Sequence, residues 1–133
     1  MFARTERLLL RPGWAEDAPA LARAIADEAI VRNLKPDFVA LAKFPIFAIV
    51  AAKGSATAIV SRVFTPYYAI DEDPVTGSAH AVMVPYWAQT LGDSFTAFQA
   101  SARGGRLTCA LAGDRVILGG ACVTVIEGSF LLL

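Results

Sequence analysis

Four residues near the middle of the chain bring a carboxylate, two hydroxyl groups and a flexible backbone position close together: Asp73, Thr76, Gly77 and Ser78. They come directly before a segment that we expect to be helical over residues 78–91. The first backbone N–H groups of a helix lack intrahelical partners, and with the positive end of the helix dipole they bind carboxylates and phosphates. Gly77 lets the backbone approach a ligand, Ser78 can cap the helix or donate a hydrogen bond, and Asp73 can orient a polar group or transfer a proton. These residues predict a substrate site for a small anion.

The same residues also have a structural interpretation. Asp-Pro and Thr-Gly-Ser are common turn sequences, and an acid before a helix is ordinary capping chemistry. His80, one turn into an apolar helix, is interpreted as a core histidine with satisfied hydrogen bonds rather than as a ligand-binding group. Asp71 and Glu72 are interpreted as solvated loop charges. The residues alone leave the ligand-binding and the capping interpretations of Asp73 and Ser78 both open.

The segment from Ser78 to Leu91 is apolar on nearly all of its faces, and its polar residues are only His80, Gln89 and Thr90. A helix without a polar face must be surrounded by other elements. Apolar, β-prone runs precede it at 44–52 and 58–64. We therefore expect an α+β fold in which an antiparallel sheet or partial barrel wraps round a central apolar helix.

The remaining elements are predicted from hydrophobic patterning and turn residues. After the helix we expect β segments throughout, over residues 95–102, 106–112, 115–120, 121–128 and 129–133. Near the N terminus the pattern predicts a strand at Thr5–Arg11, a helix that opens at Trp14 and ends near Asn33, and a shorter helix over 35–43.

Composition excludes several classes of function. The chain has 133 residues, enough for one domain, and its 12 basic and 12 acidic residues cancel. Without a basic patch we expect no binding to nucleic acid or to an anionic membrane. The hydrophobic fraction of 56% and the mean hydropathy of +0.52 favour a buried interface, such as that of a homodimer, or reflect an Ala-rich and Val-rich composition.

No membrane-spanning segment is expected, because the longest uncharged run, residues 74–92, contains polar residues and prolines. The first residues lack a signal-peptide core, so the cytoplasm is the expected location. Cys109 and Cys122 both lie in β-like runs and are predicted to be buried thiols. With His80 as the single further soft ligand, they do not predict a zinc site or any other metal site.

Five spaced motifs resemble a known family: Arg62-Val-Phe-Thr-Pro, Ile70-Asp-Glu-Asp-Pro-Val-Thr-Gly-Ser-Ala-His, Pro85-Tyr-Trp, Gln99-Ala-Ser-Ala-Arg-Gly-Gly, and Asp114-Arg-Val followed by Gly119-Gly-Ala. In this order they are similar to the second half of the PhzF-like isomerases of phenazine biosynthesis, over about Leu34 to Leu133. The resemblance implies a diaminopimelate-epimerase-like half, in which a sheet or partial barrel surrounds a central helix.

Members of that family are cofactor-independent isomerases or epimerases that remove and return a proton on small carboxylated substrates, in a cleft between two similar halves. The resemblance implies that Asp73 matches the family's aspartate and that Gly77 and Ser78 match its anion-binding turn. The family's main catalytic glutamate and its Gly-His motif do not appear here, and Ala69 stands where glycine is common. The resemblance thus implies a retained half-site without the family's full catalytic set, in which Glu16 or Glu28 would have to replace the glutamate.

Residues 1–34 resemble the opening strand and helix of a GNAT acetyltransferase, without the coenzyme A loop of that family. The expected organisation is this segment, 1–34, packed on a PhzF-like domain, 35–133. Three functions stay open: an isomerase-related domain that binds a small carboxylate, a non-catalytic recombined module, and an acetyltransferase remnant. Whether the chain is an enzyme is not decided by its residues.

Overall fold

The computed structural model describes residues 3–4, 9–10 and 27–129. Two short strands, β1 (Ala3–Arg4) and β2 (Leu9–Leu10), pair antiparallel, and β2 falls within the predicted N-terminal strand. The predicted helix opening at Trp14, together with Glu16, and the last four residues of the predicted C-terminal strand lie outside the described residues.

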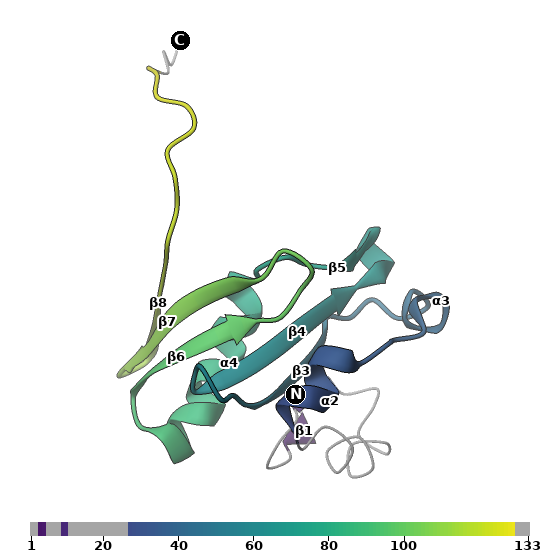
Figure 1. Ribbon diagram of the computed structural model, residues 1–133, viewed down its shortest axis with the longest axis horizontal. Coiled ribbons are helices and arrows are strands. Elements are labelled where there is room, and N and C mark those ends of the chain that lie inside the picture. The colour runs from purple at the N-terminus through teal and green to yellow at the C-terminus, as the bar shows by residue number, and fades with distance from the viewer. Residues whose placement is uncertain (1–2, 5–8, 11–26, 130–133) are drawn as a thin grey trace.

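A six-stranded sheet forms the body of the described chain (Figure 1). Its strands run in the order β3-β4-β6-β7-β8, and β5 pairs with the C-terminal end of β4. Their bounds are β3 (Ala48–Lys53), β4 (Ile59–Thr65), β5 (Ile70–Glu72), β6 (Ser94–Gln99), β7 (Gly105–Ala112) and β8 (Arg115–Gly120). The two best-defined predicted strands, 106–112 and 115–120, are confirmed as a hairpin. The strand predicted over 44–52 begins only at Ala48.

The expectation of an antiparallel sheet is wrong at one pair of strands, because β4 and β6 run parallel. The chain passes between them through α4 (Gly77–Leu91), the predicted central helix, which starts one residue earlier than expected. Parallel neighbours need a crossover connection of this kind, since a tight turn reverses the strand direction. The sheet is therefore mixed.

Helices cover both faces of the β3–β4 part of the sheet. One hydrophobic core lies between the sheet and α4, and the other lies beneath α2 (Glu28–Asn33) and α3 (Phe38–Leu41). Alternate β4 residues enter the two cores, so that Val63 faces α4 while Phe64 lies in the other core. This explains the continuous hydrophobicity of these strands, because a strand covered on both sides needs no polar face. The helix predicted to end near Asn33 is confirmed in its last turns, whereas the predicted 35–43 helix is shorter.

The central helix is buried on one face only. The buried residues of α4 are Ala79, His80, Met83, Val84, Trp87 and Ala88. Ala81, Pro85 and Gln89 are exposed, so the prediction that the helix is surrounded on all sides is wrong for the described part of the chain. The sheet lies along one side of α4 and leaves its opposite side open. None of the helices in the described residues is long and apolar enough to cross a membrane.

The strand predicted over 121–128 is also wrong. Residues 121–129 follow β8 as an extended, exposed segment without strand pairing (Figure 1). A β-prone sequence becomes a strand only when a neighbour supplies hydrogen bonds, and β propensity cannot supply that neighbour. Cys122 lies in this segment and is exposed, which contradicts its predicted burial. Cys109 on β7 is buried as predicted, and this burial raises the pKa of its thiol.

Candidate functional site

The start of α4 lies beside a half-buried carboxylate. Thr76, which is buried, is the N-cap residue of α4, and its hydroxyl donates a short hydrogen bond to the Asp73 carboxylate. Ser78 is therefore not the capping residue: it is the second residue of the helix and is exposed. Because the Thr76 hydroxyl binds Asp73 rather than a backbone N–H of the helix, it orients the carboxylate at the helix N-terminus.

Gln99, at the end of β6, holds Asp73 and Thr76 in place through hydrogen bonds to both residues. Its side chain is fully buried; Oε1 accepts from the Thr76 N–H at 2.8 Å, and Nε2 donates to the Asp73 carbonyl at 2.6 Å. The sequence motif that contains Gln99 did not predict this role. The available signal was a polar residue at an inward-facing position of an alternating strand, where burial requires hydrogen-bond partners.

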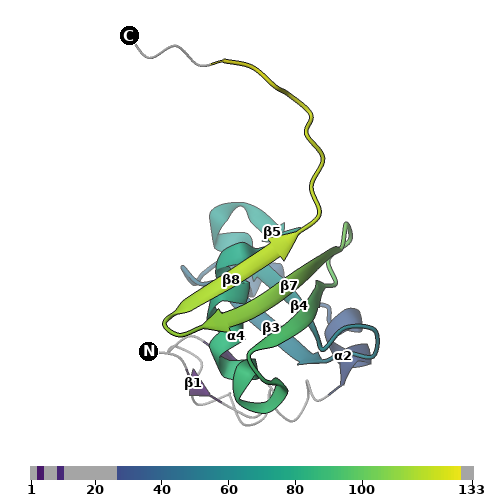
Figure 2. The ribbon, with the colours of Figure 1, turned by 90° about the vertical axis from the view of Figure 1, so that its left-hand side faces the viewer.

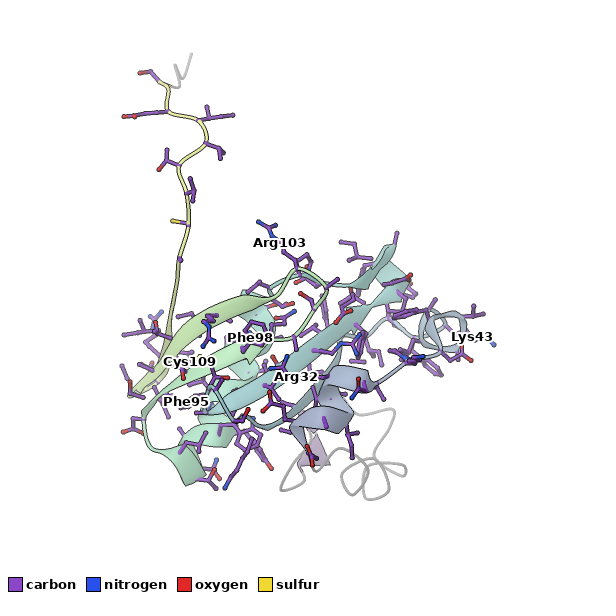
Figure 3. All side chains as sticks on the ribbon, viewed as in Figure 1. Arg32, Lys43, Phe95, Phe98, Arg103 and Cys109 are labelled. Carbon is purple, nitrogen blue, oxygen red and sulfur yellow. The ribbon has the colours of Figure 1, made fainter. Side chains whose placement is uncertain are left out.

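Asp73 and Gly77 line an open groove of about 1130 Å³ together with the β6–β7 loop and the end of β8. Arg103 and Arg106 are also among the residues that line the groove. The Arg106 guanidinium lies 5.8 Å from the Phe98 ring centroid, on the sheet face that packs against α2 and α3. Arg103 lies out on the β6–β7 loop (Figure 3). A Cβ atom added to Gly77 would meet nothing within 4 Å, so this backbone position is open to a ligand. Ser78 does not line the groove but lies one residue away from Gly77.

Close backbone packing shapes the groove where β7 begins. A Cβ atom on Gly105 would lie 2.2 Å from Val75 Cγ2, so only glycine allows β7 to approach the loop before α4. Ser101 joins the same two segments, because its hydroxyl donates to the Pro74 carbonyl at 2.7 Å. The loop before α4 and the β6–β7 loop are thus held together on one side of the groove.

The interpretation of Glu72 as a solvated loop charge is wrong. It lies on β5, half-buried, and both of its carboxylate oxygens accept from Arg62, at 2.7 Å from Nε and 3.0 Å from Nη2. Arg62 also donates from Nη1 to the Leu34 carbonyl at 2.6 Å, just beyond the end of α2. Glu72 is a structural group because it lies beside Arg62 on the neighbouring strand, whose side chain is 12% exposed. Short-range sequence patterns do not show this contact. Asp71, on the same strand, is exposed.

His80 is a core histidine, as predicted. It is fully buried, with Nδ1 2.8 Å from the Thr76 carbonyl and Nε2 3.4 Å from the Ser61 hydroxyl. Burial lowers the pKa of its imidazole, because the charged form loses solvation that its neighbours do not replace.

The burial of His80 predicts a pH-dependent loss of stability. Below the ordinary histidine pKa of about 6.5, the unfolded chain binds a proton that the folded chain does not, so the free energy of unfolding falls as the pH falls. Urea denaturation between about pH 7 and about pH 5 measures this slope. The chain has one histidine. The His80→Asn variant is expected to be less stable at neutral pH but to show a shallower slope over this range. An unchanged slope would contradict the assignment.

Glu28, considered as a replacement for the family's glutamate, lies elsewhere. It begins α2, in the layer opposite α4, where Oε2 accepts from the Ser55 N–H at 2.6 Å and Oε1 pairs with Arg32. The Ser55 hydrogen bonds, followed by those from Arg32, lower the pKa of this carboxyl. Glu28 is not among the residues that line the groove, and Glu16 lies outside the described residues. Within the described ranges, no group of three or more His, Cys, Asp or Glu residues could hold a metal ion.

Comparisons with known proteins agree with this arrangement of elements. Residues 18–128 match the PhzC-PhzF family, described as phenazine biosynthesis-like protein. An uncharacterized isomerase of Pseudomonas aeruginosa is 51% identical over 106 residues, which cover 78% of this chain and 41% of the relative. A phenazine biosynthesis-like domain-containing protein of Homo sapiens is 51% identical over 71 residues, covering 52% of this chain and 25% of that protein. The crystal structure of a PhzF-family protein from Enterococcus faecalis superimposes with a TM-score of 0.67 at 46% identity, covering 71% of this chain and 37% of that one.

Two features of these matches refine the expectations from sequence. The family match begins at residue 18 rather than near Leu34, and the comparisons give no support to an acetyltransferase-like N-terminal segment. The chain spans about two fifths of the length of the curated isomerases that it matches. With most of its length matched to the family, this chain belongs to the PhzC-PhzF family of phenazine biosynthesis-like proteins.

Proposed function

We propose that this chain is an isomerase-related domain that binds a small carboxylate-bearing molecule in the groove at the start of α4. The observation that carries the proposal is that Asp73 and Gly77 line one open groove with Arg103 and Arg106. A ligand carboxylate placed there meets backbone N–H groups and the positive end of a helix of 15 residues, with Arg103 on the neighbouring β6–β7 loop. Thr76 holds the Asp73 carboxylate beside this position, and the exposed Ser78 lies at its rim.

In this proposal, Asp73 is the group that exchanges a proton with the ligand. A carbon acid next to the bound carboxylate gives its proton to Asp73, and Asp73 returns the proton to the same carbon or to its conjugated neighbour. Isomerisation by this route needs no cofactor. The relatives from Pseudomonas aeruginosa and Halalkalibacterium halodurans are described as isomerases, which supports this reaction class.

The second candidate is a non-catalytic binding module with the same ligand. It is favoured by the composition of the groove, because Asp73 is the only carboxylate among the described residues that line it. Inversion or transfer of a proton across two faces of a substrate is efficient when two acid–base groups are present. Under this candidate the domain binds the carboxylate and does not exchange protons with it.

Replacing Gly77 with valine is expected to abolish ligand-induced stabilisation. Gly77 has no positive φ angle and its Cβ position is empty, so the substitution leaves the fold intact but places a branched side chain where the ligand approaches. The measurement is the thermal unfolding midpoint of the full chain with a panel of small carboxylates, such as succinate and L-glutamate. A ligand at about one hundred times its Kd stabilises the wild-type protein by about 2.7 kcal/mol.

The matched control is Ala81→Val, which places the same branched side chain one turn further along the exposed face of α4. Equal stabilisation of wild type and Gly77→Val by the same carboxylate would exclude the helix N-terminus as the site. To separate the two candidates, the wild type and the Asp73→Asn variant are incubated with a binding carboxylate in deuterium oxide and followed by NMR. Deuterium uptake at carbon that requires Asp73 supports the isomerase-related function, and binding without uptake supports the module.

A further inference from the structure

The edge of the sheet at β8 continues directly into the exposed C-terminal segment. In the part of the chain that the structure describes, β8 pairs with β7 on one side and has no strand on its other side. Figure 2 shows β8 at this edge, with the segment leaving its end. Val125 and Ile126 in that segment are each 87% exposed. Residues 115–127 thus form one continuous stretch, which we name the edge segment, with unused backbone hydrogen-bonding groups and exposed β-branched side chains.

An edge of this kind is a template for pairing with another strand. The edge segment is rich in the β-branched residues that stabilise strands. Val116 and Leu118 on β8 pack against the α4 core but remain only partly buried. A further strand beside β8 would bury them and satisfy the free backbone groups of the edge.

The edge segment is complementary to itself when two copies run antiparallel. Pairing centred on Ala121 places Arg115 of each copy opposite Glu127 of the other, because both residues are six positions from Ala121. The same register places Val125 opposite Ile117, and Ile126 opposite Val116. Apolar residues therefore meet apolar residues on both faces of the sheet, and opposite charges meet at both ends. Arg115 is available for this pair, since its own contact with Asp114 is 3.9 Å long and exposed.

We propose that two copies of this chain associate through the edge segment, as antiparallel strands related by a two-fold axis at Ala121. The interface is isologous, so it closes after two copies and joins the two sheets into one. The proposal does not rest on the ligand groove, and it identifies a specific surface for the homodimer that the hydrophobic composition favours.

The first test is the mass in solution, measured by light scattering after size exclusion across a hundredfold dilution of the full chain. We expect a dimer for the wild type and an increase of about tenfold or more in the dimer Kd for Val125→Lys, because the charge occurs twice in each dimer. The control is Val39→Lys on α3, where a valine that is 78% exposed is replaced far from the edge segment in sequence. Both valines are exposed, so both variants are expected to fold.

The register is tested by exchanging charges. Glu127→Arg alone is expected to weaken the dimer, and the double variant Arg115→Glu with Glu127→Arg is expected to restore it. In a Cys122→Ser background, Ala121→Cys is expected to form a disulfide between copies on mild oxidation, since this residue faces its own equivalent across the axis. A wild-type monomer at all concentrations, growth beyond two copies, or a dimer unaffected by Val125→Lys would overturn the proposal. If the dimer Kd of the double variant were raised as much as that of Glu127→Arg, the proposed register would be wrong.

Discussion

Replacing Arg62 with leucine is expected to lower the free energy of unfolding by about 3 kcal/mol. The guanidinium joins three parts of the fold, because it pairs with Glu72 on β5, donates to carbonyls at the end of α2 and lies 4.8 Å from the Phe64 ring centroid. Leucine keeps much of the volume but leaves the Glu72 carboxylate, whose side chain is 17% exposed, without its partner. Removing one member of a mostly buried ion pair costs far more than the pair itself contributes.

Urea denaturation of the full chain measures this loss, with Arg32→Leu as the control. Arg32 also forms an ion pair with a glutamate, but on the surface of one helix and with 42% of its side chain exposed, so its removal is expected to cost about 0.5 kcal/mol. Adding Glu72→Leu to Arg62→Leu should recover part of the lost stability, because the unpaired charge is then absent. If Arg32→Leu and Arg62→Leu lowered the free energy of unfolding equally, the proposed structural role of Arg62 would be wrong.

Replacing Gln99 with leucine is expected to cost about 2–3 kcal/mol and to weaken carboxylate binding in the groove. The substitution leaves the buried Thr76 N–H and the Asp73 carbonyl without the partners that Gln99 supplies. Unpaired buried groups of this kind carry their full desolvation cost. The loop that presents Asp73 should then lose its fixed position, so binding falls even though Gln99 does not line the groove.

Gln89→Leu is the matched control for Gln99→Leu. Gln89 is exposed on α4, where its Nε2 donates to the Pro85 carbonyl at 3.0 Å, and its replacement is expected to change stability by less than about 0.5 kcal/mol. Denaturation and carboxylate titration are measured on both variants. If Gln99→Leu were as stable as Gln89→Leu and bound carboxylates like the wild type, the proposed support of the Asp73 loop would be wrong.

The sequence predicted those elements whose identity depends on local patterning. The apolar run at Ser78 identified α4, and the turn at Gly113 identified the β7–β8 hairpin, because periodicity and turn residues act over a few positions. The sequence did not predict that β4 and β6 are parallel neighbours, since that pairing depends on where α4 directs the chain. For the same reason the segment after β8 was predicted as a strand, although its partner was unknown.

The residues of the candidate site were likewise predicted only where their role depends on nearby residues in the sequence. Asp73, Thr76 and Gly77 were candidates because they lie at the start of a predicted helix. In the structure Thr76 binds Asp73, and Asp73 and Gly77 line the groove. Gln99 supports them from 23 residues beyond Thr76, and Arg62 pairs with Glu72 between strands. Such contacts are properties of the sheet register rather than of short sequence motifs.

The parallel contact between β4 and β6 also has a consequence for how the domain folds and opens. The β3–β4 hairpin and the β6–β7–β8 meander each consist of neighbours in sequence, and each of their long pairs spans six residue positions. The β4–β6 pair spans only three, Ile59 to Ser61 with Ala97 to Gln99, and it forms only after a long loop containing α4 has closed. The β3–β4 hairpin and the β6–β7–β8 meander are therefore expected to be two cooperative units that meet at the β4–β6 contact. Hydrogen exchange under native conditions should show that the amides of the β4–β6 pair open at a lower free energy than those inside either unit. The β4–β6 pair and α4 are expected to form late in folding.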